Sequence, residues 1–571
     1  MTELLTAAQM RAIEEAAIAS GAVTGLELME RAGRGVVEAI VEEWPELGPG
    51  CRAVVLSGPG NNGGDGFVVA RLLWEAGWDV EVFLYGDASR LPADARVNYE
   101  RWCERGEVVA LSDETLFRSR ANTSADDREC IVIDALFGTG LSRPLDRDVG
   151  MHLSGTRSTG SFAFMKLVAV DCPSGVCIDS GRVLGQQNVP TATDLCVTFH
   201  RAKIGHYVTP LVDAISKLVI VDIGLEEDFS SKISRIGEGF GSMFEIAAQG
   251  GAGAIREEAL SEAMHGAYET LAERDGAVRL LEAWFPDELG KAAAIGGHKY
   301  AHGHALIHSG GVGRGGAARM AARGALRIGA GLVTVGCPPG ALQENAGALD
   351  AVMLRSVADG EALREMLGDA RISAIGIGPG LGTGAREAGL VRAVLDASAD
   401  AKRGVVLDAD ALTLVAQDES LFDLCRSHRS VVMTPHAGEF ARLFPDIAKR
   451  LEEQPMSGPA YSKVDAAREA AARAGCVVLF KGPDTVIASP EGHCSVNSAA
   501  YDRAAPWLAT AGSGDVLTGF IAGLLARGFG PMQAAETAAW LHVECALSFG
   551  PGLIAEDLPE ELPTMFRALG V

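Results

Sequence analysis

Residues 509–523 read Ala-Thr-Ala-Gly-Ser-Gly-Asp-Val-Leu-Thr-Gly-Phe-Ile-Ala-Gly. Small residues run directly into a helical apolar pattern, which predicts that Gly512 to Asp515 lie at the N-terminus of a helix. Unpaired N–H groups and the positive end of the helix dipole meet there, so the loop is expected to hold a phosphate or a developing oxyanion. Asp515 then fits a base aimed at a substrate hydroxyl. A simple turn with Asp515 as the helix cap is the alternative.

On either side of this loop, short β-rich runs alternate with helical patterns in two series. The first series follows helices expected over 7–19 and 26–43. The strands expected are 51–57, 79–85, 130–134, 167–171, 194–199 and 217–222, then 303–308, 332–335, 372–377, 404–407, 430–434 and 476–480. This alternation predicts an α/β fold of parallel sheets covered by helices, with ligands at the carboxyl ends of the strands.

Composition narrows the class of protein. A formal charge of -25 over 571 residues, without a basic patch, argues against nucleic acid or an anionic membrane as a partner. No apolar run approaches the ~20 residues of a membrane span, and the N-terminus lacks a signal-peptide pattern. We therefore expect a soluble cytoplasmic protein. Its 11 cysteines include no Cys-x-x-Cys pair, which favours reduced structural thiols.

Three loops after strands of the first series carry unusual residues. Gly58 to Gly66 matches the dinucleotide G-x-G-x-x-G spacing, but its Asn-Asn-Gly-Gly-Asp core adds amides and a carboxylate that suit specific hydrogen bonding or cation ligation. A pure turn is the alternative there. The second loop is Asp134 to Pro144 and the third is Asp171 to Gly175. Carboxylates that end buried strands are costly unless they pair, bind a cation or act chemically.

Together these loops resemble the epimerase domain of the NAD(P)H-hydrate repair enzymes, over roughly residues 1–225. The resemblance implies a Rossmann-like three-layer α/β/α domain that interconverts the R and S hydrates of NADH and NADPH, with Asp171 as acid/base. It also implies K⁺ held by Asn62, Asp134 and Ser174. The implied substrate-binding residues are Asn61, Asn62, Gly63, Gly64, Asp65, Gly138, Thr139, Gly140, Leu141, Ser142, Arg143 and Pro144. Two departures are Cys172 and the non-helical run between Gly150 and Lys166.

Loops of the second series also hold glycines and charged residues. They are Gly310 to Ala318, Gly376 to Gly384, Asp408 to Leu412, Thr434 to Phe440 and Lys481 to Thr485. With the Gly512 to Asp515 loop they resemble the ribokinase-like α/β dehydratase domain of the same family, over about 303–547.

This second resemblance implies that Lys481, Gly482, Pro483, Asp484, Thr485 and Gly514 hold the nucleotide, and that Ala317, Gly380, His436 and Asp515 face the hydrate. Asp515 would be catalytic, acting on the S hydrate. The nucleotide implied is ADP with Mg²⁺, because bacterial members use ADP and eukaryotic ones ATP, and fusion of the two domains is typical of bacteria. The domains expected are therefore 1–225, epimerase, and 293–571, dehydratase, with a partly helical connection over 226–292.

Several alternatives stay open. A vitamin or sugar kinase with an accessory nucleotide-binding domain would carry the same second loop set, and a binding module that has lost catalysis would keep the first fold. Four histidines between His298 and His308 invite a metal site, but solvated loop histidines are the favoured interpretation. A homo-oligomer is compatible with the sequence.

Overall fold

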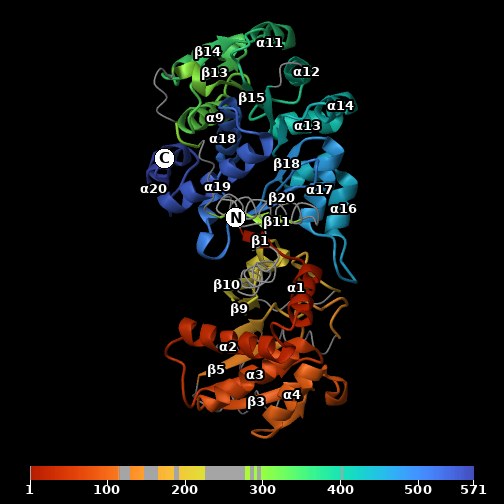
Figure 1. Ribbon diagram of the computed structural model, residues 1–571. Helices are drawn as coiled ribbons and strands as arrows, with labels where there is room; N and C mark the ends of the chain where they lie inside the picture. Colours follow the sequence, from red (N-terminus) through yellow and green to blue (C-terminus); the bar gives the residue numbers. More distant parts are fainter. Residues whose placement is uncertain are drawn as a thin grey trace, which may run out of the picture. The chain divides into compact units, whose positions relative to one another are not determined.

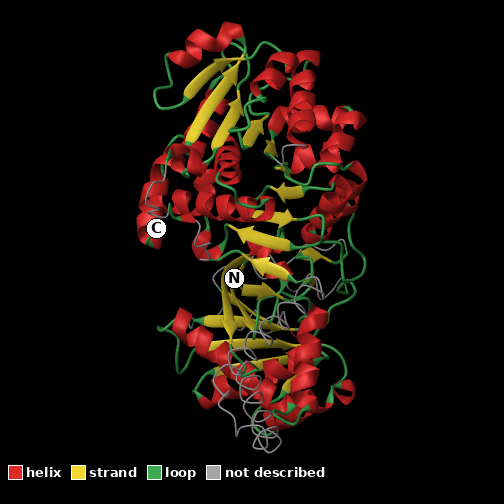
Figure 2. Cartoon of the chain, turned by 45° about the horizontal axis from the view of Figure 1, so that its top comes forward, coloured by secondary structure: helices red, strands yellow, loops and turns green. Residues whose placement is uncertain are grey.

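The computed structural model describes residues 2–112, 115, 129–146, 165–185, 192–225, 277–282, 289–291, 298–399 and 403–571. The chain divides into two compact units. The first unit comprises Glu3–Ala277 and Gln454–Ser462, and the second comprises Met1–Thr2, Val278–Glu453 and Lys463–Val571. In both units, helices and strands interleave (Figure 2). The irregular run predicted between Gly150 and Lys166 falls mostly outside the described residues, as does most of the predicted connection.

A seven-stranded parallel sheet, ordered β10-β9-β6-β5-β2-β3-β4, forms the centre of the first unit. Its strands are β2 (Arg52–Ser57), β3 (Asp79–Leu84), β4 (Val108–Ala110), β5 (Cys130–Ala135), β6 (Lys166–Val170), β9 (Thr193–Phe199) and β10 (Ile215–Val221). β2 and β5 are buried throughout, as expected for parallel strands covered on both faces. A separate short hairpin joins β7 (Val176–Cys177) to β8 (Arg182–Val183).

Helices α1 (Ala7–Ala19), α2 (Gly25–Glu43), α3 (Asn61–Glu75) and α4 (Ala93–Cys103) complete this unit (Figure 1). The prediction of a loop over Gly58 to Gly66 is wrong from Asn61 onward, because α3 begins there with Gly60 as its N-cap. A Cβ at Gly63 would collide with the backbone of Gly58. Glycine therefore lets the first turn of α3 lie directly against the end of β2.

The sheet of the second unit is ordered β11-β20-β19-β18-β17-β16-β15-β12-β13-β14. Its pairs are parallel from β18 to β14, whereas β19 pairs antiparallel with both β18 and β20. The strands are β11 (Val278–Leu280), β12 (His304–His308), β13 (Leu332–Cys337), β14 (Met353–Ser356), β15 (Ala374–Ile377), β16 (Gly404–Leu407), β17 (Val431–Met433), β18 (Val477–Phe480), β19 (Asp484–Ala488) and β20 (Cys494–Ser498). The short strand β1 (Thr2–Leu4) is divided between the two units in sequence. β11 lies within the predicted connecting region.

Helix α18 (Ser513–Ala526) packs against α9 (Gly316–Arg327), β15 and β16. The other helices are α10 (Leu342–Ala346), α11 (Gly360–Met366), α12 (Ala385–Ala399), α13 (Ala409–Gln417), α14 (Glu419–Arg426), α15 (Ala437–Leu443), α16 (Pro445–Glu452), α17 (Lys463–Ala474), α19 (Pro531–Phe549) and α20 (Asp557–Leu569). Residues Val516 to Ala526 of α18 are all buried. The predicted helix start at Gly512 to Asp515 is thus confirmed, with the loop at the surface end of a core helix.

The interpretation of the 298–308 histidines as solvated is wrong for two of them. His304 and His308 point into the core from β12, and His304 Nε2 lies 2.8 Å from Thr334 Oγ1. Among the described residues, no group of three or more His, Cys, Asp or Glu side chains could hold a metal ion.

All 11 cysteines are free thiols, mostly buried, which agrees with the predicted structural role. No described helix is both long and apolar enough to cross a membrane.

Candidate active sites

Asp171 lies at the carboxyl end of β6 in the first unit and is the centre of the first site. Its φ of 66° is unusual for a residue with a side chain. Oδ1 accepts hydrogen bonds from Thr198 Oγ1 at 2.9 Å and from Lys203 Nζ at 3.0 Å, while Oδ2 accepts one from Thr139 N at 3.0 Å. Strained backbone held by this many bonds is typical of a functional position.

Lys203 is a functional candidate that the sequence interpretation missed. Its ammonium group is buried, with the side chain 1% exposed, and donates to Thr198 Oγ1 at 2.7 Å as well as to Asp171. Burial raises the pKa of Asp171, but Lys203, His206 and the Thr139 N–H outweigh it and lower the pKa overall. Asp171 is therefore a carboxylate. The signal available in the sequence was a lysine shortly after β9, because β9 pairs with β6, the strand that ends just before Asp171.

Gly138 brings the predicted substrate loop against both Asn62 and Asp171. A Cβ at Gly138 would lie 2.8 Å from Asn62 Oδ1 and 2.9 Å from Asp171 Oδ2. The side chains of Asn62 and Asp171 thus converge on one point. Asn62 Nδ2 is buried and has no hydrogen-bond partner in the described part of the chain, so a ligand is a natural partner for it.

Asp134 and Ser174 meet beside this point. Ser174 donates from Oγ to Asp134 Oδ1 at 2.6 Å and from its N–H to Oδ2 at 2.9 Å. Burial raises the pKa of Asp134 despite these bonds. No cationic side chain within the described ranges pairs with this carboxylate, which is 1% exposed. A cation would therefore relieve its desolvation.

Asp65 supplies a second acid near Asp171. Burial, then the charges of Asp171 and Glu14, raise its pKa well above the ordinary value. Glu14, on α1, has its own pKa raised by burial and by Asp171, and the sequence had not singled it out. The site thus holds one ionised carboxylate beside others with a raised pKa, an arrangement that separates acid and base roles.

The other predicted substrate-binding residues, in 61–65 and 138–144, differ in how far they are exposed. Gly63 and Gly64 serve packing, because a Cβ at Gly64 would lie 2.6 Å from Met29 Sδ. Asn61, Gly140, Ser142 and Arg143 are exposed, and Leu141 and Pro144 are half-buried.

The second site surrounds the N-terminus of α18. Gly512 caps this helix with φ of 93°, and a Cβ there would lie 2.6 Å from Met320 Cε. Asp515 is in the first turn, and no side chain caps the helix. Burial and the charge of Asp408, opposed by Lys481, raise the pKa of Asp515 to about 6. Asp515 therefore titrates close to neutrality, as suits a general base.

Lys481 links the strand ends around Asp515. Its Nζ lies 2.7 Å from Asp408 Oδ1 and 3.7 Å from Glu439 Oε2. Thr518 Oγ1, from α18, donates to the other oxygen of Asp408 at 2.9 Å. Burial lowers the pKa of Lys481, but the neighbouring acids outweigh it and raise the pKa, so Lys481 stays cationic. A Cβ at Gly514 would lie 3.6 Å from Nζ.

The turn after β18, predicted to bind the nucleotide, is fixed by hydrogen bonds from Lys463 and between its own residues. Lys463 Nζ pairs with Asp484 Oδ1 at 2.6 Å and also donates to Asp484 O at 2.9 Å. Thr485 Oγ1 donates to Gly482 O at 2.8 Å. Asp484 is buried, so its carboxylate supports the turn, with Gly482 and Pro483 between it and Lys481.

The predicted hydrate residues of the second unit fall into two places. Gly380 has φ of 64°, and its Cβ would lie 3.7 Å from Ala317 Cβ, so these two residues are neighbours. His436 caps α15 instead, with Nδ1 accepting from Gly438 N at 3.0 Å. Its Nε2 lies 3.4 Å from Glu439 Oε1, which connects it to the Lys481 network.

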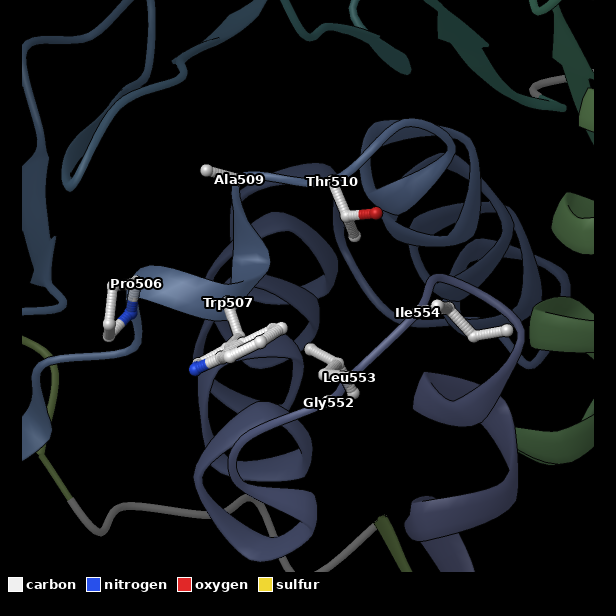
Figure 3. Close-up of a pocket in the computed structure, with 7 residues that line it drawn as sticks. All are labelled: Pro506, Trp507, Ala509, Thr510, Gly552, Leu553 and Ile554. Atoms are coloured by element: carbon white, nitrogen blue, oxygen red, sulfur yellow. The ribbon is translucent and has the colours of Figure 1, made fainter.

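A cavity of about 410 Å³ opens beside the Gly512 loop. Figure 3 shows that its walls come from the segment before α18 and the segment after α19. The lining residues are Pro506, Trp507, Ala509, Thr510, Gly552, Leu553 and Ile554. Thr510 O accepts a hydrogen bond from Ser513 Oγ at 3.0 Å, which ties this wall of the cavity to the loop.

Comparison with known proteins gives matches in both halves. Residues 25–205 match the family model described as YjeF-related protein N-terminus, and residues 305–563 match NAD(P)H-hydrate dehydratase. A NAD(P)H-hydrate epimerase from Rhodobacter capsulatus is 48% identical over 36% of this chain and 92% of its own. An ADP/ATP-dependent NAD(P)H-hydrate dehydratase from Bacillus subtilis, co-crystallised with ATP and Mg²⁺, is 28% identical over 51% of this chain and 99% of its own, with a TM-score of 0.40.

Several relatives span nearly the whole chain. The bifunctional NAD(P)H-hydrate repair enzyme Nnr of Moorella thermoacetica is 32% identical over 99% of this chain and 97% of its own length. The chain therefore belongs to the family of bifunctional NAD(P)H-hydrate repair enzymes.

Proposed function

We propose that this protein repairs hydrated NADH and NADPH in the cytoplasm. Residues 1–225 epimerise the R and S hydrates, residues 293–571 dehydrate the S hydrate at the expense of ADP, and residues 226–292 connect them. The observation that carries the proposal is a pair of acids, one after strand β6 and one in the first turn of helix α18, whose pKa values are shifted in opposite directions. Asp171 is held ionised by Lys203, whereas the pKa of Asp515 is raised to about 6.

Epimerisation inverts the carbon that bears the hydroxyl next to the ring nitrogen. The C–O bond breaks as the nitrogen lone pair forms an iminium, and water adds to the opposite face. The leaving hydroxyl needs a proton and the incoming water must lose one. Asp65, whose pKa is raised, is the fitting donor, and the Asp171 carboxylate is the fitting acceptor. Asn61 to Asp65 and Gly138 to Pro144 would enclose the hydrate.

The donor set of Asn62, Asp134 and Ser174 fits K⁺, because all three residues offer oxygen ligands and Asp134 is buried without a cationic partner in the described residues. When bound there, K⁺ would offset the Asp134 charge and attract an anionic group of the substrate. The residues themselves orient the loop, since Ser174 Oγ accepts from Phe137 N at 2.9 Å.

Dehydration begins at the hydroxyl of the S hydrate. Asp515 takes its proton, and the oxygen attacks the β-phosphoryl group of ADP, which releases AMP. The nitrogen lone pair then expels phosphate, and loss of a proton from the adjacent carbon restores NAD(P)H. The N–H groups at the start of α18 would stabilise charge on the transferred phosphoryl group. Ala317, Gly380 and His436 would face the hydrate.

We assign the nucleotide to Lys481, Gly482, Pro483, Asp484, Thr485 and Gly514. The Lys481 ammonium group supplies positive charge beside Gly514, and the turn that follows is fixed by Lys463. Mg²⁺ would arrive with the diphosphate and reduce its charge. The choice of ADP as donor is the part of the proposal that rests on the family.

Recovery of reduced-nicotinamide absorbance from mixed R and S hydrates in potassium buffer tests both activities at once. We expect full recovery with ADP and none without nucleotide. Recovery that stops when the S form is exhausted would contradict the epimerase. Accumulation of a phosphorylated product without elimination would favour a kinase instead.

A further inference from the structure

Nine residues of the first unit come from the second half of the sequence. Gln454–Ser462, here called the strap, lies between α16 and α17 in the chain, yet it belongs to the compact unit formed by Glu3–Ala277. Residues on both sides of it, Glu453 and Lys463, belong to the second unit.

Hydrogen bonds fix the beginning of the strap to the segment around β8. Gln454 Nε2 donates to Val183 O at 2.9 Å and to Gly185 O at 2.6 Å. Gly185 N in turn donates to Pro455 O at 2.8 Å. Bonds in both directions between two segments define their register.

The middle of the strap contacts the predicted substrate loop. Gly458 N donates to Ser142 O at 2.9 Å, and a Cβ at Gly458 would lie 3.2 Å from Leu141 O. Leu141 also packs on a small apolar cluster of Cys177, Leu184 and Ala460, of which Ala460 belongs to the strap. The strap thus touches both the backbone and the side chain of this part of the loop.

The other end of the same loop is tied to the catalytic residue. Thr139 N donates to Asp171 Oδ2 at 3.0 Å, so the loop runs from Asp171 to the strap within a few residues. We propose that the strap is a positioning element of the epimerase site, holding Leu141 and Ser142 so that the Gly138–Pro144 loop keeps its place over the hydrate. This inference rests on the proposed epimerase function.

The test compares full-length variants in R-to-S interconversion without nucleotide, followed by chromatographic separation of the two forms. Gly458→Val places bulk against Leu141 O, and Gln454→Ala removes the bonds to Val183 and Gly185 without adding bulk. Met456→Ala is the matched control, because Met456 is 62% exposed. Dehydration of purified S hydrate by the same variants reports on the integrity of the second unit.

We expect the KM for the hydrate to rise about tenfold in Gly458→Val and by a smaller factor in Gln454→Ala. A tenfold rise corresponds to about 1.4 kcal/mol of lost binding free energy. The pH profile of kcat should stay unchanged, because Asp171 and Lys203 are untouched. Wild-type KM in both variants would overturn the strap's role, as would an equal change in Met456→Ala. Absence of epimerisation in the parent chain would instead overturn the proposed function.

Discussion

At the scale of single residues, the two sites differ in how the protein sets the charge of an aspartate. Lys203 lies within hydrogen-bonding distance of Asp171 and is almost fully buried. Asp515 forms no such ion pair within the described residues, and the nearby Lys481 pairs with Asp408 at 2.7 Å instead. The first carboxylate is thereby kept ionised, and the second is left close to the pH at which it gains a proton.

Replacing Lys203 with Met should slow epimerisation and move its acid limb to higher pH. Lys203 is a cation that lowers the pKa of Asp171, so its removal raises that pKa and protonates the base at a higher pH. Breaking a buried pair also costs about 3–5 kcal/mol of stability. The pH profile of epimerisation checks this, with S-hydrate dehydration as control. An unmoved acid limb would contradict the role of Lys203.

Asp515 should give dehydration an acid limb near pH 6, because only the ionised carboxylate can accept the hydroxyl proton and its pKa is raised to about 6. Asp515→Asn should lower kcat about 10²- to 10⁴-fold, the usual worth of general base catalysis. Initial rates from pH 5 to 8 with purified S hydrate measure both. A flat profile would remove Asp515 as the base.

The same substitution should stabilise the protein at neutral pH. A raised folded-state pKa means that the favourable contribution of the protonated acid is present below about pH 4 and is lost as pH rises through about 6. At pH 7.5 the ionised group therefore destabilises the fold. Asn should recover on the order of 1–3 kcal/mol, seen as a higher Tm at pH 7.5 but not at pH 4. Equal Tm shifts at both pH values would contradict this origin.

At the scale of elements, the helix that begins at Ser513 depends on a glycine cap. Gly512 needs a positive φ, and any Cβ there would meet Met320. Both constraints act on the loop that carries Asp515, so the shape of the cap and the place of the base are linked.

Gly512→Ala should therefore destabilise the second unit by about 1–2 kcal/mol and reduce dehydration. Adding Met320→Ala to it removes the collision with Met320 but leaves the φ penalty and the close approach to Ala555 Cβ at 3.0 Å, so only part of the lost activity should return. Dehydration rates of the single and double variants, with Met320→Ala alone as control, measure the two contributions. Complete rescue by Met320→Ala would show that neither φ nor the Ala555 contact contributes.

Elements were also where sequence reasoning succeeded and failed. Apolar runs such as 51–57 and 404–407 predicted strands, because parallel strands buried on both faces form nearly continuous apolar segments in the sequence. β19 and β20 were missed because the chain turns antiparallel there, with polar residues such as Asn497 inside the sheet. Asn62 and Asp171 were named as candidates from their motifs, whereas Lys203 and its contact with Asp171 required the geometry of the fold.

At the scale of the whole molecule, two compact units carry two sets of candidate catalytic residues. Each set lies inside one unit, with Asp171 in the first and Asp515 in the second. Substitutions in the intact chain should therefore remove epimerisation or dehydration separately.

Asp171→Ala should consume only the S part of a mixed hydrate preparation, and Asp515→Asn should consume none. A mixture of the two variants should restore full recovery of absorbance with ADP, because the S hydrate released by one chain can enter the other. The time course of recovery checks this against each variant alone. Failure of the mixture, with both variants folded, would mean that hydrate does not pass between chains.

The strap has a consequence for synthesis on the ribosome. The described part of the first unit runs to Leu225 before residues 226–276, which the structure does not describe. About 230 residues separate Leu225 from Gln454. At roughly 5–20 residues per second, the ribosome needs about 10–45 s to deliver the strap. Over that interval the apolar side chains of Leu141, Cys177 and Leu184 lack the Ala460 cover that they have in the finished protein. The nascent first unit should be at its most vulnerable to aggregation and to chaperone capture during this interval.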